Sequence, residues 1–246
     1  MYLHYLKLKN RLASFVSSRV AKLALDTKIT PKELKMTLDN KCLVLVSNPM
    51  DEAIGLAGLM LTYPKNFEIL LMTTGYTDEG TIGGIASHVA ISDEIKFAME
   101  TLRPLGYKIF DIPAGTIHKA QRIFEKINIS EIDYLFLPNI FSKNPDDIAL
   151  LNNVAKLLEE TEIKKNLKIV FFEVNSTLIA PNYFFDITSK LKLKSDLINS
   201  YKTRTSNKKW FEIIEGLNRF RGYQMGCKYA EAFTILTVED FLKLVK

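Results

Sequence analysis

Five short apolar runs, separated by segments of helical periodicity, constrain the fold of this chain more than any other feature. The runs are rich in Val, Ile, Leu and Phe and mostly lack polar alternation, which is typical of strands covered on both faces. Such strands in alternation with helices predict an α/β fold, a Rossmann-like three-layer sandwich around a mainly parallel sheet. The predicted strands cover residues 42–46, 67–73, 108–112, 134–137 and 168–174.

Helical patterns fill the segments between these runs and continue after the last of them. We predict helices over 53–61, 93–102, 117–126, 146–160, 189–202, 209–220 and 238–245, and a short strand over 233–236. Thr237 and Asp240 have the spacing of a capping box that opens the final helix. Ligands of such folds bind outside the carboxyl ends of the strands, so loops 47–52 and 139–147 are the expected site.

The length of 246 residues suffices for one large α/β domain. No repeat or low-complexity stretch marks a boundary, so we predict a single domain over residues 41–246 after a helical extension over residues 1–40. Cys42 and Cys227 indicate no disulfide framework and favour a reducing, cytoplasmic compartment. No apolar run approaches the roughly 20 residues of a membrane-spanning helix, so we expect a soluble chain.

The N-terminal segment combines basic and apolar residues at helical spacing. Its basic residues precede Asp26, the first acidic residue, in a chain of net charge +5. Such a helix can lie on an anionic membrane surface, hold a protein partner or pack on its own domain, and packing is the favoured interpretation. Nucleic acid is not an expected partner, because no recognisable binding module is present. The basic residues are Lys7, Lys9, Arg11, Arg19 and Lys22.

Several common site motifs are absent. The sequence contains no G-x-G-x-x-G after the first apolar run, no G-x-x-x-x-G-K-[ST] and no G-x-S-x-G. These absences argue against three functions. They are dinucleotide binding, nucleotide binding by a P-loop and serine hydrolysis with a nucleophile elbow.

A series of other segments follows the predicted strands and loops in order. They read "VLVSNPMDEAIGLAGLM", "LRPLGYKIFDIP", "IDYLFLPNIFSKNPDDIALLNNVAKLL", "FFEV", "PNYFFDITSKLKLKSDLINSY" and "LNRFRGYQMGCKYAEAF". Together they resemble the LmbE/PIG-L family of zinc-dependent de-N-acetylases over roughly residues 42 to 236, most specifically through "PNYFFDIT" and "YAEAF". The resemblance implies a deacetylase fold and substrates that are mostly N-acetylglucosaminyl compounds.

The two site loops of that family typically read His-Pro-Asp-Asp-Glu and His-Pro-Asp-His. The resemblance implies that the first His, the second Asp and the final His bind zinc. It also implies that the first Asp is the general base and that the remaining His stabilises the oxyanion. Zinc with three protein ligands keeps an open position for water, lowers the pKa of that water and polarises the amide carbonyl.

This chain differs from the family at four of the five positions. Asn48 and Asp147 replace two zinc ligands, Met50 replaces the general base, Asn144 replaces the oxyanion histidine, and only the metal-binding Asp51 is retained. An amide is a poor zinc ligand and a thioether cannot accept a proton. We therefore predict a catalytically degenerate homologue without a bound cofactor, retained as a binding or scaffolding protein linked to glycan biosynthesis.

The remaining acidic residues leave a second interpretation open. Asp51, Asp146 and Asp147, with the amide oxygen of Asn48, can form an all-oxygen site for Mg²⁺, Mn²⁺ or Ca²⁺ in a divergent metal-dependent sugar deacetylase. The competing interpretation is that these acids stabilise the N-termini of the two helices that begin there.

Other candidate residues lie outside the two loops. His88 follows the second predicted strand, and neither His88 nor His118 falls in a site loop. Three residues are candidate substrate contacts, namely Asp146, Arg219 and Arg221. The two arginines, next to "YAEAF", can bind a phosphate or carboxylate of a sugar ligand. A solvated surface is the alternative for the arginines. An arginine that family members often carry after the second strand has no counterpart in residues 91–97.

Overall fold

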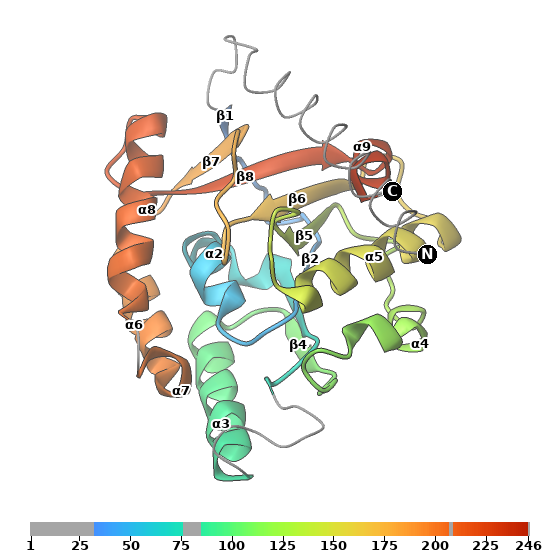
Figure 1. Cartoon of the computed structure of the whole chain (residues 1–246). Coiled ribbons are helices and arrows are strands. Elements are labelled where there is room, and N and C mark those ends of the chain that lie inside the picture. The colour runs from blue at the N-terminus through green and yellow to red at the C-terminus, as the bar shows by residue number, and fades with distance from the viewer. Residues whose placement is uncertain (1–31, 76–84, 207–208, 246) are drawn as a thin grey trace, which may run out of the picture.

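Five parallel strands form the centre of the sheet in the computed structural model, which describes residues 32–75, 85–206 and 209–245. The strands are β2 (Cys42–Val46), β3 (Phe67–Leu71), β4 (Gly106–Ile109), β5 (Tyr134–Pro138) and β6 (Lys168–Phe172). Their order is β4-β3-β2-β5-β6, so the chain winds outward from β2 on one side and then on the other (Figure 1). This doubly wound order confirms the predicted Rossmann-like α/β sandwich.

Three further strands continue the sheet beyond β6. They are β8 (Ala230–Thr237), β7 (Tyr183–Asp186) and β1 (Lys32–Glu33). β8 runs antiparallel to both β6 and β7, and β1 pairs in parallel with β7 at the edge. β8 extends the predicted strand over 233–236 in both directions. In contrast, β7 lies between the predicted strand over 168–174 and the predicted helix over 189–202, where the sequence predicts no strand.

The start of the described chain belongs to the sheet. Lys32 and Glu33 form β1, and the side chains of Leu34 and Met36 are buried in the core. Residues 1–31, which contain the predicted basic amphipathic helix, lie outside the described residues, so its membrane or partner contact stays a prediction. Within the described ranges, no helix is both long and apolar enough to cross a membrane.

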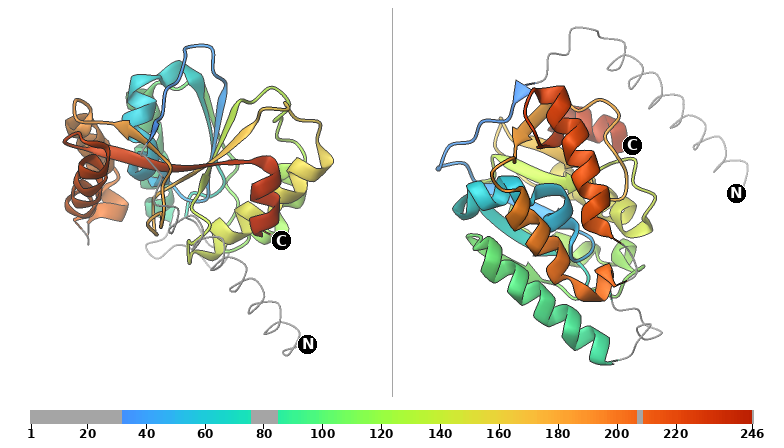
Figure 2. Two further views of the ribbon diagram at one scale, coloured as in Figure 1. Left: turned by 90° about the horizontal axis from the view of Figure 1, so that it is seen from above. Right: turned by 90° about the vertical axis from the view of Figure 1, so that its left-hand side faces the viewer.

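Helices cover both faces of the sheet (Figure 2). One layer consists of α2 (Asp51–Thr62), α3 (Ile85–Leu102), α6 (Leu191–Ser200) and α8 (Trp210–Met225). The other consists of the 3-10 turn η2 (Ile117–Lys119), α4 (Gln121–Phe124), α5 (Pro145–Glu160) and α9 (Val238–Val245). Two short elements join larger ones, namely the 3-10 turn η1 (Pro64–Asn66) before β3 and α7 (Lys202–Thr205) after α6.

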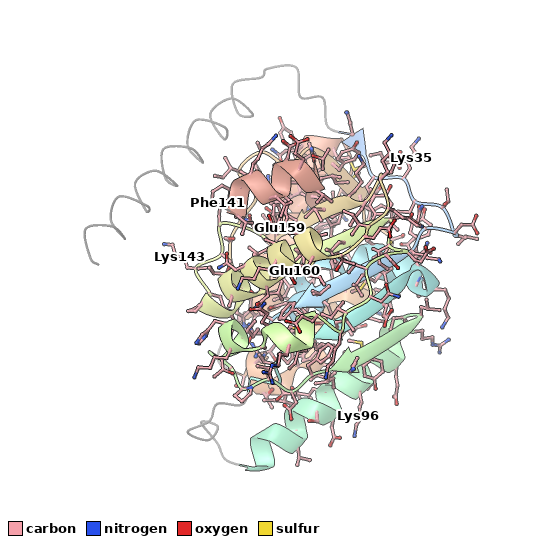
Figure 3. All side chains as sticks on the ribbon, turned by 90° about the vertical axis from the view of Figure 1, so that its right-hand side faces the viewer. Lys35, Lys96, Phe141, Lys143, Glu159 and Glu160 are labelled. Carbon is pink, nitrogen blue, oxygen red and sulfur yellow. The ribbon has the colours of Figure 1, made fainter. Side chains whose placement is uncertain are left out.

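The position of β2 between the two helical layers explains why its sequence is apolar throughout. Val44 and Val46 pack in the cluster under α2, whereas Leu43 and Leu45 pack in the cluster under α5. All four side chains are buried, and the side chains of both layers fill the space around the strand (Figure 3). Since burial of such a side chain stabilises the fold by about 1.5–3 kcal/mol, a polar residue on either face of β2 would be costly.

The ends of the helices follow local side-chain chemistry. The Thr237 Oγ1 accepts a hydrogen bond from the Asp240 backbone N–H at 3.1 Å, which confirms the predicted start of α9. Helix α8 continues past its predicted end at residue 220, because Gly226 supplies a C-cap with φ of 85°. The predicted helix over 189–202 is divided into α6 and α7.

A buried ion pair ties α6 to β8 and α2. Lys194 Nζ lies 2.8 Å from Glu231 Oε1, and the two side chains are 0% and 1% exposed. The same carboxylate accepts the backbone N–H groups of Gly58 at 2.8 Å and Leu59 at 3.0 Å. These contacts fix α6 and the turn that follows it against α2, which begins at the candidate site.

Candidate functional site

The direction of winding reverses between β2 and β5, which is where doubly wound sheets bind their ligands. The two predicted site loops follow the carboxyl ends of these two strands, one leading into α2 and the other into α5. β2 and β5 are direct neighbours in the sheet, so the fold brings the two loops together. Figure 3 shows Phe141 and Lys143 in the second loop, beside α5.

In the first loop, Met50 has an unusual backbone conformation. Its φ of 77° lies in the left-handed region, which is uncommon for a long side chain. Met50 is the N-cap of α2, its side chain is buried, and it makes no side-chain hydrogen bond to the helix. The loop therefore presents a thioether to the core at the position where the resembled family has its general base.

The carboxylates that follow Met50 begin α2. Asp51 and Glu52 lie in the first turn and are 4% and 0% exposed, where the helix dipole favours negative charge. Asp51 Oδ2 accepts the backbone N–H of Asn48 at 3.2 Å. Burial raises the pKa of Asp51 well above its usual value, and the neighbouring Asp147 carboxyl raises it further.

In the second loop, Asn144 and Asp146 have structural partners. Asn144 Oδ1 accepts the backbone N–H of Asp146 at 3.0 Å and caps α5. Asp146 Oδ2 accepts the backbone N–H of Gly115 at 2.8 Å, which fixes the loop after β4. Asn144, at the oxyanion position of the resembled family, therefore caps α5, and Asp146 holds the loop after β4.

Asp147 joins the two loops. It is 1% exposed, and its carboxylate accepts one hydrogen bond from the hydroxyl of Ser47 and another from Ser142 Oγ at 2.5 Å. Asn48 Nδ2 in turn donates to Ser47 Oγ at 2.9 Å. Burial raises the pKa of Asp147, although the two hydroxyl hydrogen bonds oppose that shift. The sequence did not indicate either serine as a site residue.

Glu52 has a partner from a distant part of the chain. The hydroxyl of Tyr201 donates to Glu52 Oε1 at 2.5 Å, and both side chains are fully buried. Among the described residues, Glu52 Oε2 has no hydrogen-bond partner. Burial raises the pKa of Glu52 from 4.5 to about 7, against the opposing effect of the Tyr201 hydrogen bond. The sequence offered no signal for this contact, which joins residues 149 positions apart.

The donor set at this site does not fit a zinc ion. No three His, Cys, Asp or Glu side chains in the described part of the chain are placed to hold a metal. Both oxygens of Asp147 accept hydroxyl hydrogen bonds, and Asn48 contributes a neutral amide. The alternative all-oxygen site for Mg²⁺, Mn²⁺ or Ca²⁺ is also disfavoured, because Asp146 and Asp147 already accept hydrogen bonds from protein donors.

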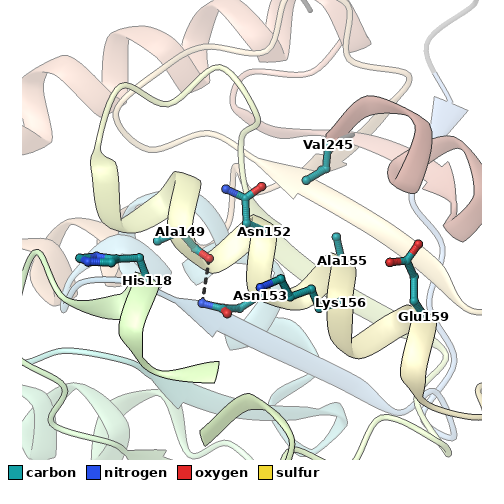
Figure 4. Close-up of a pocket in the computed structure, with 8 residues that line it drawn as sticks. All are labelled: His118, Ala149, Asn152, Asn153, Ala155, Lys156, Glu159 and Val245. Carbon is teal, nitrogen blue, oxygen red and sulfur yellow. Dashed lines mark hydrogen bonds between the residues drawn. The ribbon is translucent and has the colours of Figure 1, made fainter. Parts of the chain in front are cut away.

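Of the two candidate histidines, only His118 has a side chain within the described part of the structure. His118 is exposed on η2 and lines a separate cavity of about 470 Å³ beside α5, with Asn152, Lys156 and Val245 (Figure 4). His88 lies in α3, and its side chain is outside the described part of the structure. The structure therefore does not bring His118 to the loops after β2 and β5.

The two candidate arginines have different surroundings. Arg221 is 4% exposed, and its Nη2 lies 2.5 Å from Glu173 Oε1 and 2.8 Å from Leu178 O, so its guanidinium is held inside the protein. Arg219 is exposed and donates to the Tyr229 hydroxyl at 3.3 Å. Of the two, Arg219 is the one that solvent or a ligand reaches.

Solved structures share this architecture. The conserved protein TT1542 from Thermus thermophilus matches with a TM-score of 0.64 and 18% identity, over 79% of this chain and 94% of its own. The N,N'-diacetylchitobiose deacetylase from Pyrococcus horikoshii, complexed with its inhibitor MPG, matches with a TM-score of 0.63 and 18% identity, over 93% and 94%. The chain has the LmbE/PIG-L-like deacetylase fold.

This deacetylase-like fold does not by itself fix the chemistry. GalB, the 4-carboxy-2-hydroxymuconate hydratase from Pseudomonas putida, matches with a TM-score of 0.60 and 15% identity, over 80% of this chain and 96% of its own. No family model and no curated relative matches the sequence. Function must therefore be argued from the residues of the site.

Proposed function

We propose that this chain is a catalytically degenerate homologue of the LmbE/PIG-L de-N-acetylases, which binds or scaffolds rather than hydrolyses. The observation that carries the proposal is the hydrogen bonding of Asp147. Its carboxylate stands at a zinc-ligand position of the family, yet it accepts hydroxyl hydrogen bonds from Ser47 and Ser142. A metal there would have to displace donors that satisfy a buried carboxylate.

The residue at the general-base position supports the same conclusion. Amide hydrolysis by a metal-bound water needs a group that takes the proton of that water, a contribution of typically 10²- to 10⁴-fold. Met50 has no such group, and its side chain is 2% exposed. The nearby acids do not replace it readily, because they are buried and already accept hydrogen bonds from protein groups. These acids are Asp51, Glu52 and Asp147.

The proposed ligand class is an N-acetylated or deacetylated sugar of a glycan pathway in the cytoplasm. Support comes from the shared fold with the N,N'-diacetylchitobiose deacetylase and from partly exposed polar groups at the same edge of the sheet. Asn48 and Asn144 are half-buried there, and Lys143 is exposed. Amides and an ammonium group are suitable donors to sugar hydroxyl and acetamido oxygens.

The test is acetate release from N,N'-diacetylchitobiose by the purified full-length chain, with and without added zinc. We expect no release above background. The matched control is the variant Asn48→His, Met50→Asp, Asp147→His, which restores the two zinc ligands and the general base of the family on the same backbone. Zinc-dependent release by the wild type that disappears in Asp51→Asn would overturn the proposal. Binding of the same disaccharide, measured by calorimetry, tests the ligand class separately.

A further inference from the structure

The outer face of α8, at the edge of the molecule in Figure 1, carries large apolar side chains that are exposed to solvent. Ile213, Phe220 and Tyr223 are 59%, 54% and 84% exposed. With Gly216 they recur at intervals of three, four and three residues, a spacing that aligns side chains along one stripe of a helix. The buried residues of α8, such as Ile214, lie on the opposite side, against β8, β7 and α6. The helix therefore has a second apolar stripe, which we call the outer seam.

A comparison with α3 shows that the outer seam differs from scattered exposure. Phe97 of α3 is also 54% exposed. Its neighbours on the helix surface include the charged residues Asp93 and Glu100, and single apolar residues of this kind are common on protein surfaces. The outer seam instead aligns three large apolar side chains without a charged residue between them along the stripe. Such a contiguous stripe is typical of a protein interface.

The outer seam contains a projecting ring and a hollow. A Cβ on Gly216 would meet nothing within 4 Å, so the surface is open about one turn before Phe220. The Cζ of Arg221 lies 5.5 Å from the centroid of the Phe220 ring. Arg221 is itself held by two hydrogen bonds to the Glu173 carboxylate. The ring is therefore supported on one side by a fixed group, as expected for an aromatic residue that is preorganised for binding.

The exposed area is sufficient for the core of a stable interface. At about 200 Å² for a fully exposed large side chain, Ile213, Phe220 and Tyr223 expose on the order of 400 Å² per chain. Two copies joined through this face would bury roughly 800 Å² of apolar side chain. The exposed polar residues beside the seam, Glu212 and Arg219, would form its rim and bring the total toward the roughly 1,200 Å² of the smaller specific interfaces.

We propose that the outer seam joins two copies of this chain in an antiparallel, two-fold symmetric pair. In such an interface the same surface of both copies meets itself. A parallel arrangement would place the two Phe220 rings against each other and leave the hollows at Gly216 empty. The antiparallel arrangement places Phe220 of each copy over Gly216 of the other, and Ile213 opposite Tyr223, so that each ring fills a hollow. The proposal does not depend on the chemistry of the loops after β2 and β5.

The first experiment is sedimentation velocity of the purified full-length chain, from about 1 to 100 μM. We expect an equilibrium between monomer and dimer. Phe220→Gln should weaken self-association at least about thirtyfold, as for a central aromatic residue of an interface. Phe97→Gln is the matched control, because it removes an equally exposed ring from α3, and it should leave the dissociation constant unchanged.

Two results of this experiment overturn the proposal. One is a wild type that remains a monomer at about 100 μM, whether another protein or only solvent then covers the outer seam. The other is an equal effect of Phe220→Gln and Phe97→Gln on self-association. Circular dichroism checks that both variants are folded, which we expect because both positions are exposed.

The second experiment tests the antiparallel arrangement by a charge pair. Ile213→Glu and Tyr223→Lys should each weaken self-association, because each places a charge opposite an apolar side chain. The double variant should associate at least about tenfold more tightly than either single variant, since the new carboxylate of each copy faces the new ammonium group of the other. A parallel arrangement would bring like charges together instead. A double variant that associates no better than the single variants overturns the antiparallel arrangement.

Discussion

Substitution of Lys194 by methionine tests whether the buried ion pair holds the second half of the chain on α2. Lys194 and Glu231 are 0% and 1% exposed and lie 2.8 Å apart. In Lys194→Met, the Glu231 carboxylate keeps its hydrogen bonds from Gly58 and Leu59 but loses its counter-ion. Removal of one partner of a buried pair typically costs about 3–5 kcal/mol, and we expect the free energy of unfolding to fall by that amount.

The assay is urea unfolding at neutral pH, followed by circular dichroism. The double variant Lys194→Met, Glu231→Gln should recover at least about half of the loss, since the amide oxygen still accepts a backbone N–H and no charge is left buried. The control is Lys243→Met, which removes one partner of the surface pair with Glu239 and should cost at most about 0.5 kcal/mol. If Lys194→Met costs no more than Lys243→Met, the pair does not stabilise the fold as argued.

Three further predictions concern single residues. Folded Glu52 keeps its proton up to about pH 7, whereas the unfolded side chain releases it near 4.5. Stability should therefore fall by roughly 3 kcal/mol as the pH rises through that window, and urea unfolding of Glu52→Gln should show a flatter profile. Asn144→Ala removes the N-cap of α5 and should cost about 1 kcal/mol in the same assay, while an unchanged value would deny its capping role. In α8, a Cβ on Gly222 would meet the Lys228 backbone at 2.6 Å, but a Cβ on Gly216 meets nothing within 4 Å. Gly222→Ala should therefore lower the Tm and Gly216→Ala should raise it slightly, and a reversed order would contradict the packing.

The parallel strands from β2 to β6 could be predicted from the sequence, whereas β7 and β1 could not. Strand β2 is covered on both faces, so its composition alone identifies it. Strand β7 has four residues next to Pro181, and β1 consists of Lys32 and Glu33. Neither has a decisive local pattern, because both form through pairing with distant strands. Such pairing is a property of the whole fold that a single sequence does not display.

The candidate site shows the same division. Asn48, Asp51 and Asp147 follow predicted strands, so the order of elements places them at one edge of the sheet. Tyr201 comes from a segment far along the chain, and only the packing of α6 on α2 and α3 brings it to Glu52. The hydrogen bonds from two serine hydroxyls to Asp147 could not be predicted either, because serine is common in loops and its sequence position carries little information.

The left-handed backbone at Met50 has a consequence for how this protein can change. That conformation suits Gly, Asn or Asp better than Met, so residue 50 does not determine the path of its loop. The surrounding structure does, through β2 on one side and α2 on the other. An acidic side chain can therefore return to position 50 by substitution of one residue, without any rearrangement of the main chain. The chemistry of this loop can then change through one side chain while the path of its backbone stays the same.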